Sequence, residues 1–317
     1  MTATQPFLRW QQPMRRVLIG LVPIIIMAVY AYGWRVMALL AIAGAVAVFT
    51  EWLFLRPYHE PVSSAVLVTS TLFVLSLPPA LPYWMAVVGI LFAVIFGKMV
   101  FGGFGKNIFN PALTGRAFIY VSFAGPMTSQ WTLPFNHGWG GFLAYAPSMP
   151  DAVTTATPGM LLKTGESFAI MDLAFGHLPG TIGGTYAWAV LLGGLYIVFT
   201  RTANFRIVIG GLLGYLIAGL TFWLAGAPGS MDPLRGMLAG SFLVGIFFYA
   251  TDPVSASQTN TGRWIYGAFV GALSSVIGTF SAWPAGTMFA ILLANMFAPL
   301  MDIGIRRLET RNGEAAS

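Results

Sequence analysis

The stretch Asp151–Pro158 has the residue types in this chain that are best suited to covalent chemistry. It reads D-A-V-T-T-A-T-P, with one carboxylate, three hydroxyl groups and no bulky side chain. Small neighbours let a modifying enzyme or a ligand approach the backbone, and the Thr157 hydroxyl is an oxygen that can be esterified. Asp and Thr also bend and cap chains, so the same composition is typical of a surface turn. The pattern therefore leaves two alternatives, a modified Thr157 and an ordinary turn.

A second polar stretch, residues 101–116, reads F-G-G-F-G-K-N-I-F-N-P-A-L-T-G-R. The glycines near its start permit close backbone approach, and its proline breaks a helix. Its polar side chains include Asn107, Asn110, Thr114 and Arg116. This spacing places amide and hydroxyl groups where a broken helix could hydrogen-bond a flat polar ring. The alternative interpretation is an ordinary cytoplasmic loop.

A third polar stretch, Thr251-Asp252-Pro253, interrupts the second half of the chain. Asp252 is a carboxylate between two apolar segments. A carboxylate within a membrane is a functional hypothesis by default, because an ionised side chain is disfavoured there by roughly 2.5–3.5 kcal/mol. A carboxylate near the membrane surface could simply be hydrated.

The composition defines the setting of these stretches. Of 317 residues, 57% are hydrophobic and 8% are charged, whereas a soluble domain carries about a quarter charged residues. We therefore expect an integral membrane protein in the bilayer, without a cleavable signal peptide. The absence of cysteine excludes thiolate-bound clusters and disulfides in this chain, and the three histidines are too scattered for a metal or haem site. The net charge of +6 does not indicate a nucleic-acid partner.

The apolar runs predict about ten transmembrane helices, since a spanning helix needs about 20 apolar residues. The third and eighth runs are interrupted by Ser, Thr and Gly, and the fifth is short. Interrupted spans are tolerated only where the backbone lines a cavity or is buried in protein. The predicted spans are residues 17–34, 36–55, 62–78, 83–101, a short one within 112–125, 186–200, 207–226, 236–250, 264–281 and 284–303.

The placement of the 16 Lys and Arg residues predicts the topology. With the N-terminus inside, 13 of them fall on the inner side, Lys98 and Arg116 among them, and 3 fall outside. This bias follows the positive-inside rule. We expect both termini in the cytoplasm and the long loop with Thr157 outside it.

The two halves of the chain resemble each other. Residues 113–120 read L-T-G-R-A-F-I-Y and residues 260–267 read N-T-G-R-W-I-Y-G, each after a polar break. Two halves of five spans have opposite topology, so this pattern predicts an inverted repeat with its breaks near mid-membrane. The predicted organisation is an all-α membrane protein with a first five-helix repeat (1–125), an extracytoplasmic loop (126–185) and a second five-helix repeat (186–317).

Four motifs in order carry a family resemblance. They are the 101–118 stretch, D-A-V-T-T-A-T-P, P-G-T-I-G-G-T at 179–185, and A-T-D-P-V-S-A-S-Q-T-N-T-G-R-W-I-Y-G at 250–267. Together they resemble one family of membrane subunits. It comprises NqrB of the sodium-translocating NADH:quinone oxidoreductase and RnfD of the Rnf ferredoxin:NAD complex. The resemblance runs from about residue 7 to residue 306, and it implies a ten-helix inverted repeat.

The resemblance also implies two flavins. One is FMN, joined by a phosphodiester to Thr157, with Asp151 and Thr154 recognised by a flavin transferase. The other is a noncovalent riboflavin between the repeats. Its expected site comprises the polar residues of the two breaks, Asn107, Asn110, Thr114, Arg116, Thr251 and Asp252.

The chain departs from the family pattern at two carboxylate positions, where it has Ser64 and Gly184. Lost carboxylates put sodium coupling in question, because such groups coordinate or attract a cation. For the same reason we expect Asp252 to hold a flavin ring rather than a cation. The motifs at the two breaks are closer to the quinone-reductase member of the family, whereas the short N-terminal segment is closer to the Rnf member.

These observations predict a flavin-carrying subunit of an ion-translocating redox complex, which relays electrons across the inner membrane and is not catalytic alone. Its expected partners are the other membrane and peripheral subunits of such a complex, the flavin transferase and, if the quinone enzyme is the right member, quinone. Two alternatives stay open: a transmembrane flavin conduit that does not pump, and a small-solute channel or transporter of inverted-repeat fold. An esterified Thr157 would argue against the channel.

Overall fold

The computed structural model describes residues 6–147, 157–281 and 286–315, so Asp151 and Thr154 lie outside the described residues. The described chain is mostly helical, with one parallel pair of two-residue strands, β1 (Leu8–Arg9) and β2 (Val62–Ser63). Its longer helices are α1 (Gln12–Tyr32), α2 (Arg35–Leu55), α3 (Ala65–Leu75), α4 (Tyr83–Val94), α5 (Pro111–Ser122), α9 (Ala187–Phe199), α10 (Phe205–Leu224), α13 (Asn260–Phe280) and α14 (Gly286–Ala315). Its short helices are η1 (Arg56–Tyr58), η2 (Ile95–Met99), α6 (Ala124–Ser129), η3 (Gly140–Leu143), α7 (Pro158–Lys163), α8 (Ile170–Phe175), α11 (Pro233–Leu238), α12 (Phe242–Val244) and η4 (Gly245–Tyr249).

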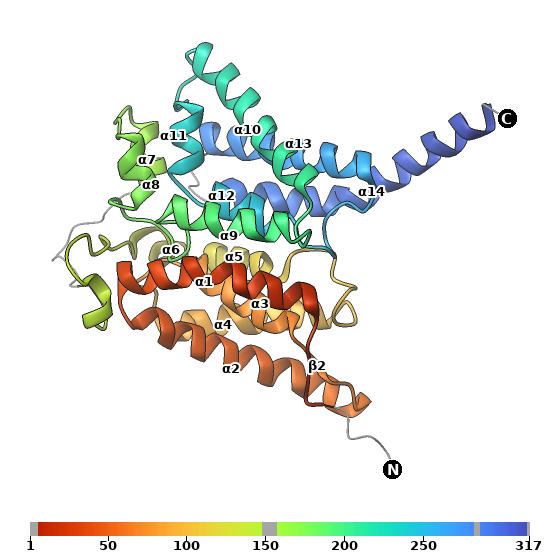
Figure 1. Ribbon diagram of the computed structural model, residues 1–317, viewed down its shortest axis with the longest axis horizontal. Coiled ribbons are helices and arrows are strands. Elements are labelled where there is room, and N and C mark those ends of the chain that lie inside the picture. Colours follow the sequence, from red (N-terminus) through yellow and green to blue (C-terminus); the bar gives the residue numbers. More distant parts are fainter. Residues whose placement is uncertain (1–5, 148–156, 282–285, 316–317) are drawn as a thin grey trace.

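The long helices lie roughly side by side along one direction of the molecule (Figure 1). Helices α1 to α4 form one side, and α10, α13 and α14 form the other. The start of α1 and the end of α14 both lie toward the right of this view, whereas α7 and α8 lie at the opposite end.

Each of the ten predicted spans contains helix, but their lengths differ. Four helices are long and apolar enough to cross a membrane: Gln12–Tyr32, Arg35–Tyr58, Phe205–Leu224 and Gly286–Arg311. The third predicted span, 62–78, contains only the eleven residues of α3, and the eighth, 236–250, is divided among α11, α12 and η4. The predicted interruption is therefore present in the eighth span, whereas α3 is short but continuous through Thr69, Ser70 and Thr71. Backbone groups freed at such breaks need other partners inside the protein.

The two polar breaks have similar local structures. Each follows a π-helical turn, η2 before residues 100–110 and η4 before residues 250–259. After each break a helix begins at a capping side chain: the Asn110 side-chain oxygen accepts from two backbone N–H groups at the start of α5, and the Thr259 hydroxyl accepts from Gly262 N at the start of α13. Pro111 at the first position of α5 suits a helix start, because its missing N–H has no partner there in any case.

Close helix contacts depend on glycine at two crossings. A Cβ on Gly271 of α13 would overlap the carbonyl oxygen of Gly211 on α10, and a Cβ on Gly193 of α9 would overlap that of Gly20 on α1. Small residues let helix backbones approach closely, which is how helices associate where no hydrophobic effect drives them together. The second crossing joins α1 to a helix of the other half of the chain.

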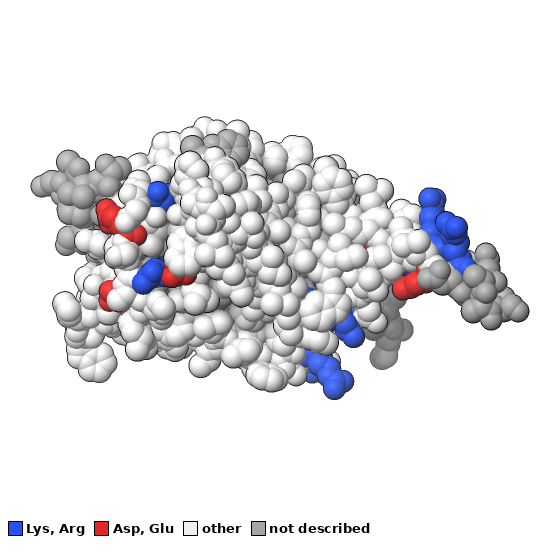
Figure 2. All heavy atoms as spheres, turned by 90° about the horizontal axis from the view of Figure 1, so that it is seen from above, with Lys and Arg blue, Asp and Glu red and all other residues white. Residues whose placement is uncertain are grey.

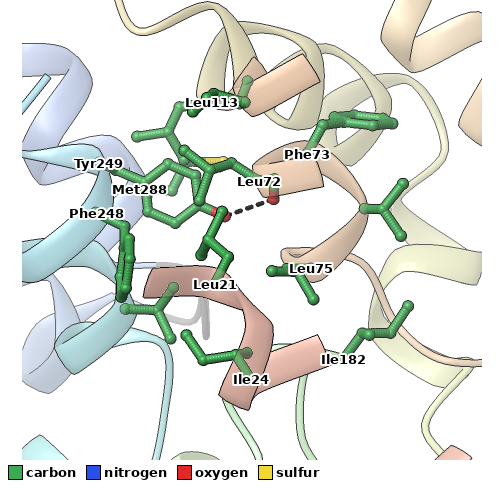
Figure 3. Close-up of a cluster of buried hydrophobic side chains, with 14 of the residues drawn as sticks. Leu21, Ile24, Leu72, Phe73, Leu75, Leu113, Ile182, Phe248, Tyr249 and Met288 are labelled. Atoms are coloured by element: carbon green, nitrogen blue, oxygen red, sulfur yellow. Dashed lines mark hydrogen bonds between the residues drawn. The ribbon is translucent and has the colours of Figure 1, made fainter. Parts of the chain in front are cut away.

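The centre of the molecule is an apolar cluster to which both halves contribute (Figure 3). Leu21 of α1 and Leu72 of α3 pack there with Tyr249 of η4 and Met288 of α14. The Tyr249 hydroxyl donates a hydrogen bond of 2.6 Å to the Leu72 carbonyl oxygen, the dashed line in Figure 3. This bond satisfies the phenol hydroxyl inside the cluster, where the Ser76 side chain also faces it.

The outer surface has the distribution of a membrane protein. Figure 2 shows the described Lys, Arg, Asp and Glu side chains toward the two ends of this face, with an uncharged middle. Large apolar side chains such as Phe49, Ile217 and Leu300 are exposed on the long helices. Exposed apolar side chains on long helices suit contact with lipid.

A buried amide joins the two halves near the breaks. Asn295 of α14 is fully buried, and its side-chain oxygen accepts from Asn110 N at 3.1 Å. Its amide nitrogen donates to the Ser255 carbonyl oxygen at 3.2 Å and to the Tyr266 hydroxyl at 2.8 Å. The Asn110 amide in turn donates to the Tyr249 carbonyl oxygen at 3.3 Å. One side chain thus satisfies groups from α5, the second break and α13.

We expect Asn295→Leu to destabilise the protein by roughly 3 kcal/mol, because buried polar groups that lose their partners cost about 1–3 kcal/mol each. Thermal unfolding in detergent would measure the change. The exposed Asn260→Leu is the control and should change the midpoint little. Equal midpoints for Asn295→Leu and the unmodified protein would contradict the role of this junction.

Candidate functional site

The two polar breaks meet at one pocket, which we call the Asp252 pocket. Its cavity of about 60 Å³ lies between the first and second halves of the chain. Four of the six residues predicted for the noncovalent flavin line this pocket, together with Thr69, Lys98 and Phe104. Those four are Asn107, Asn110, Thr251 and Asp252.

Asp252 is held by the second break itself. Its carboxylate accepts from the Ser255 hydroxyl at 2.7 Å and from Ser255 N at 3.3 Å, and the Asn107 side chain also faces it. A partner for Asp252 from the first break is therefore Asn107. Thr114 does not line the pocket, because its hydroxyl donates to the Asn110 carbonyl oxygen at 3.0 Å within α5.

A buried ion pair borders the same pocket. Lys98 Nζ lies 2.6 Å from a carboxylate oxygen of Glu51, and both side chains are at most 2% exposed. The other Glu51 oxygen accepts from Ser63 N at 3.1 Å. Lys98, which we counted on the inner side, thus has its side chain buried in η2. A buried pair with further hydrogen bonds is the arrangement in which the charges offset each other's loss of hydration.

A second pocket, which we call the Thr157 pocket, lies at the end of the molecule that carries α7 and α8. Its cavity is about 70 Å³. Besides Thr157 it is lined by Arg116, Thr181, Gly184 and Ser241. Arg116, which we grouped with the noncovalent flavin and counted on the inner side, lines this pocket and not the Asp252 pocket. The reason is its position along α5, six residues beyond Asn110.

Thr157 sits at the N-terminus of α7 with its hydroxyl unused for capping. Its carbonyl oxygen accepts from Met160 N at 2.9 Å and from Leu161 N at 3.1 Å, but its side chain makes no capping hydrogen bond. The residue is partly exposed. The backbone at Thr157 is therefore fixed by the helix start, while its hydroxyl caps no backbone N–H of α7.

Sequence reasoning missed a second carboxylate at the breaks. Asp302 of α14 accepts from the hydroxyls of Ser257 and Thr259, at 2.6 and 2.7 Å, and from Gln258 N at 2.7 Å. Ser257, in the same break as Asp252, thus donates to Asp302. The signal was present, because Asp302 is a carboxylate within the last apolar run.

Comparison with known proteins identifies the family of this chain. The sequence profile of the NQR2, RnfD, RnfE family matches residues 2–310. The chain belongs to this family. Its curated relatives include NqrB of Pseudomonas aeruginosa, a subunit of the Na(+)-translocating NADH-quinone reductase. That protein is 39% identical over 277 residues, which cover 84% of this chain and 66% of the relative.

Other members of the NQR2, RnfD, RnfE family match at similar levels. The protein of the same name from Neisseria meningitidis is 38% identical over 277 residues, with 85% of this chain and 66% of the relative covered. That from Haemophilus influenzae is 40% identical over 253 residues, with 77% and 60% covered. The chain spans less than two thirds of the length of these relatives. Family membership and the several apolar helices identify a multi-pass membrane protein.

We expect Lys98→Met to destabilise the protein by about 3–5 kcal/mol, because it leaves the Glu51 charge buried without its partner. The double variant Glu51→Gln with Lys98→Met removes both charges and should recover most of that loss. Thermal unfolding of the two single variants and the double variant, under one detergent condition, measures the coupling. Additive losses in the double variant would show that the pair does not act as a unit.

Proposed function

We propose that this protein is a flavin-carrying membrane subunit of an ion-translocating redox complex, in which it relays electrons between two flavins. The observation that carries the proposal is the Thr157 pocket, where a hydroxyl free of capping bonds lies in a cavity with the cation of Arg116. Membership of the NQR2, RnfD, RnfE family supports it, since named relatives are subunits of a Na(+)-translocating NADH-quinone reductase.

The covalent group would be FMN, joined to Thr157 through a phosphodiester. A flavin supplies one- and two-electron chemistry, and the chain's own residues position it and modify its surroundings. The cavity fits the phosphate end, because it is small and borders a guanidinium. The flavin transferase would recognise the surrounding motif, including Asp151 and Thr154.

The noncovalent flavin, a riboflavin, would occupy the Asp252 pocket. The donor and acceptor set fits, because Asn107, Thr251 and Asp252 offer amide, hydroxyl and carboxylate groups at one opening. The cavity volume of about 60 Å³ is smaller than the volume of a flavin ring. Binding would therefore widen the pocket, and the partly exposed Phe104 is the side chain best placed to move.

The proposed setting is the inner membrane, with both termini in the cytoplasm and an inverted repeat of five and five spans. The start of α1 and the end of α14 lie toward one end of the molecule, and the Thr157 pocket lies at the other (Figure 1). The two π turns, each followed by a polar break and a capped helix, support the repeat. The remaining subunits would supply the nicotinamide chemistry, and quinone would be a further partner if the complex is the quinone enzyme.

A conduit that does not pump is a second candidate function, which two positions favour. Ser64 is fully buried and its hydroxyl accepts from Gln11 N at 3.0 Å, and Gly184 has no side chain to offer a cation. Glu51, the nearby carboxylate, is occupied by Lys98. Sodium prefers several oxygen ligands, as hard cations do, so these positions weaken a sodium site here.

Thr157→Ala should abolish a fluorescent flavin band on a denaturing gel when the protein is made together with its flavin transferase. Substitution removes the oxygen that forms the ester bond. The matched control is Thr164→Ala at the other end of α7, which keeps the band because its exposed hydroxyl only bonds the Leu161 carbonyl oxygen. A fluorescent Thr157→Ala variant would overturn the attachment site.

Asp252→Asn should release noncovalent riboflavin, because it removes an acceptor for a ring N–H or a ribityl hydroxyl while keeping the side-chain shape. The flavin extracted after precipitation of the protein measures the loss, which we expect to exceed tenfold. Asp232→Asn, at the other end of the molecule, is the control. Retained riboflavin with lost sodium dependence would assign Asp252 to the ion instead, and no change in either would remove it from the site.

A further inference from the structure

Arg116 is a buried cation without a carboxylate. It lies in the middle of α5 and is 5% exposed. The titratable side chains that act on it are the phenols of Tyr249 and Tyr120, and no ion pair among the described residues includes it. Asp172 lines the same pocket, but its carboxylate is exposed and bonds His177 at 3.0 Å. The described residues therefore do not neutralise this charge.

One edge of the guanidinium also lacks a hydrogen-bond partner. Arg116 Nε is buried and has no acceptor within the described structure. An unpaired buried donor on a charged group is costly, and an uncompensated buried charge costs several kcal/mol more. An arginine is not relieved by losing its proton in proteins. Both costs disappear if an anion from outside the chain binds at this edge.

The space beside Arg116 suits a small oxyanion. The Thr157 pocket, of about 70 Å³, has room for a group the size of a few water molecules. The hydroxyls of Thr181 and Ser241 line it as further donors. Arginine presents its N–H groups in a fork that matches the oxygens of a phosphate.

We propose that Arg116 binds a phosphate group in the Thr157 pocket, and that this phosphate is the phosphodiester by which Thr157 carries its flavin. The inference rests on the proposed function and assigns Arg116 as a positioning residue for it. The same phosphate chemistry is available from a phospholipid headgroup, which the experiment separates from the flavin.

The test compares four flavinylation-competent preparations in one detergent: the unmodified protein, Arg116→Met, Thr157→Ala and the double variant. With the phosphodiester present, Arg116→Met should lower the midpoint of thermal unfolding by about 4 °C or more. In the Thr157→Ala background, Arg116→Met should leave the midpoint of thermal unfolding unchanged or raise it. Without the phosphodiester, Arg116→Met removes a buried charge that has no counterion. A shift of the midpoint that changes sign in this way would show that Arg116 interacts with the group on Thr157.

A direct readout is the phosphorus resonance of the attached flavin. It should shift in Arg116→Met, shift less in Arg116→Lys, which keeps the charge without the fork, and stay in place in Arg201→Met, an exposed cation elsewhere. If Arg116→Met is equally destabilising with and without Thr157, and phospholipid retained by the protein is lost, the phosphate comes from lipid. Phosphate binding by Arg116 is overturned by three results together. The phosphorus resonance does not shift in Arg116→Met, the stability effect of this substitution does not depend on Thr157, and no phospholipid is lost.

The failure of the proposed function is distinguishable from the failure of this inference. A wild-type protein without a fluorescent band shows that Thr157 carries no flavin, and the lipid comparison still tests Arg116. A fluorescent band together with an unchanged phosphorus resonance retains the flavin and rejects the role of Arg116. Should Arg116→Met fail to accumulate, Arg116→Lys supplies the same comparison.

Discussion

The fold depends on satisfying polar backbone groups where helices break inside an apolar body. No water is available in a bilayer core, so each freed N–H and carbonyl needs a partner from the protein. Asn110, Asn295 and Asp302 supply these partners: they bind the start of α5, the second break and the start of α13. Of these three side chains, Asn110 also lines the Asp252 pocket, so the fold and the candidate site share this residue.

Helix α5 connects the two candidate flavin sites. Asn110 at its start lines the Asp252 pocket, and Arg116, six residues later, lines the Thr157 pocket. That separation is about 9 Å along the helix axis. The apolar cluster with Tyr249 includes Leu113 of this helix (Figure 3). A rigid helix with one polar group in each pocket would keep two cofactors at a constant spacing, which is what a relay needs.

Sequence patterns predicted the helices well where local chemistry decides them. Apolar runs marked the ten segments, and Asn110 followed by Pro111 marked the start of α5, because capping and the missing proline N–H act within a few residues. Sequence patterns did not predict the hydrogen-bond and ion-pair partners of Lys98 and Asp302, or the pocket that Arg116 lines. The Lys98 charge is offset by Glu51, 47 positions away, and Asp302 binds residues more than 40 positions earlier. Such pairings depend on how the helices pack, which periodicity and charge counts do not contain.

The separation of Asn110 and Asn295 in the sequence has a consequence for biosynthesis. The N–H at Asn110 receives its acceptor from α14, 185 residues later in the chain. Until that helix inserts, the start of α5 and the second break lack this shared partner, and the Asp252 pocket lacks its final framework. A ligand of that pocket would therefore bind only after α14 has been made, whereas the segment with Thr157 leaves the ribosome much earlier. Assembly of the two sites would be separated in time by the order of the chain.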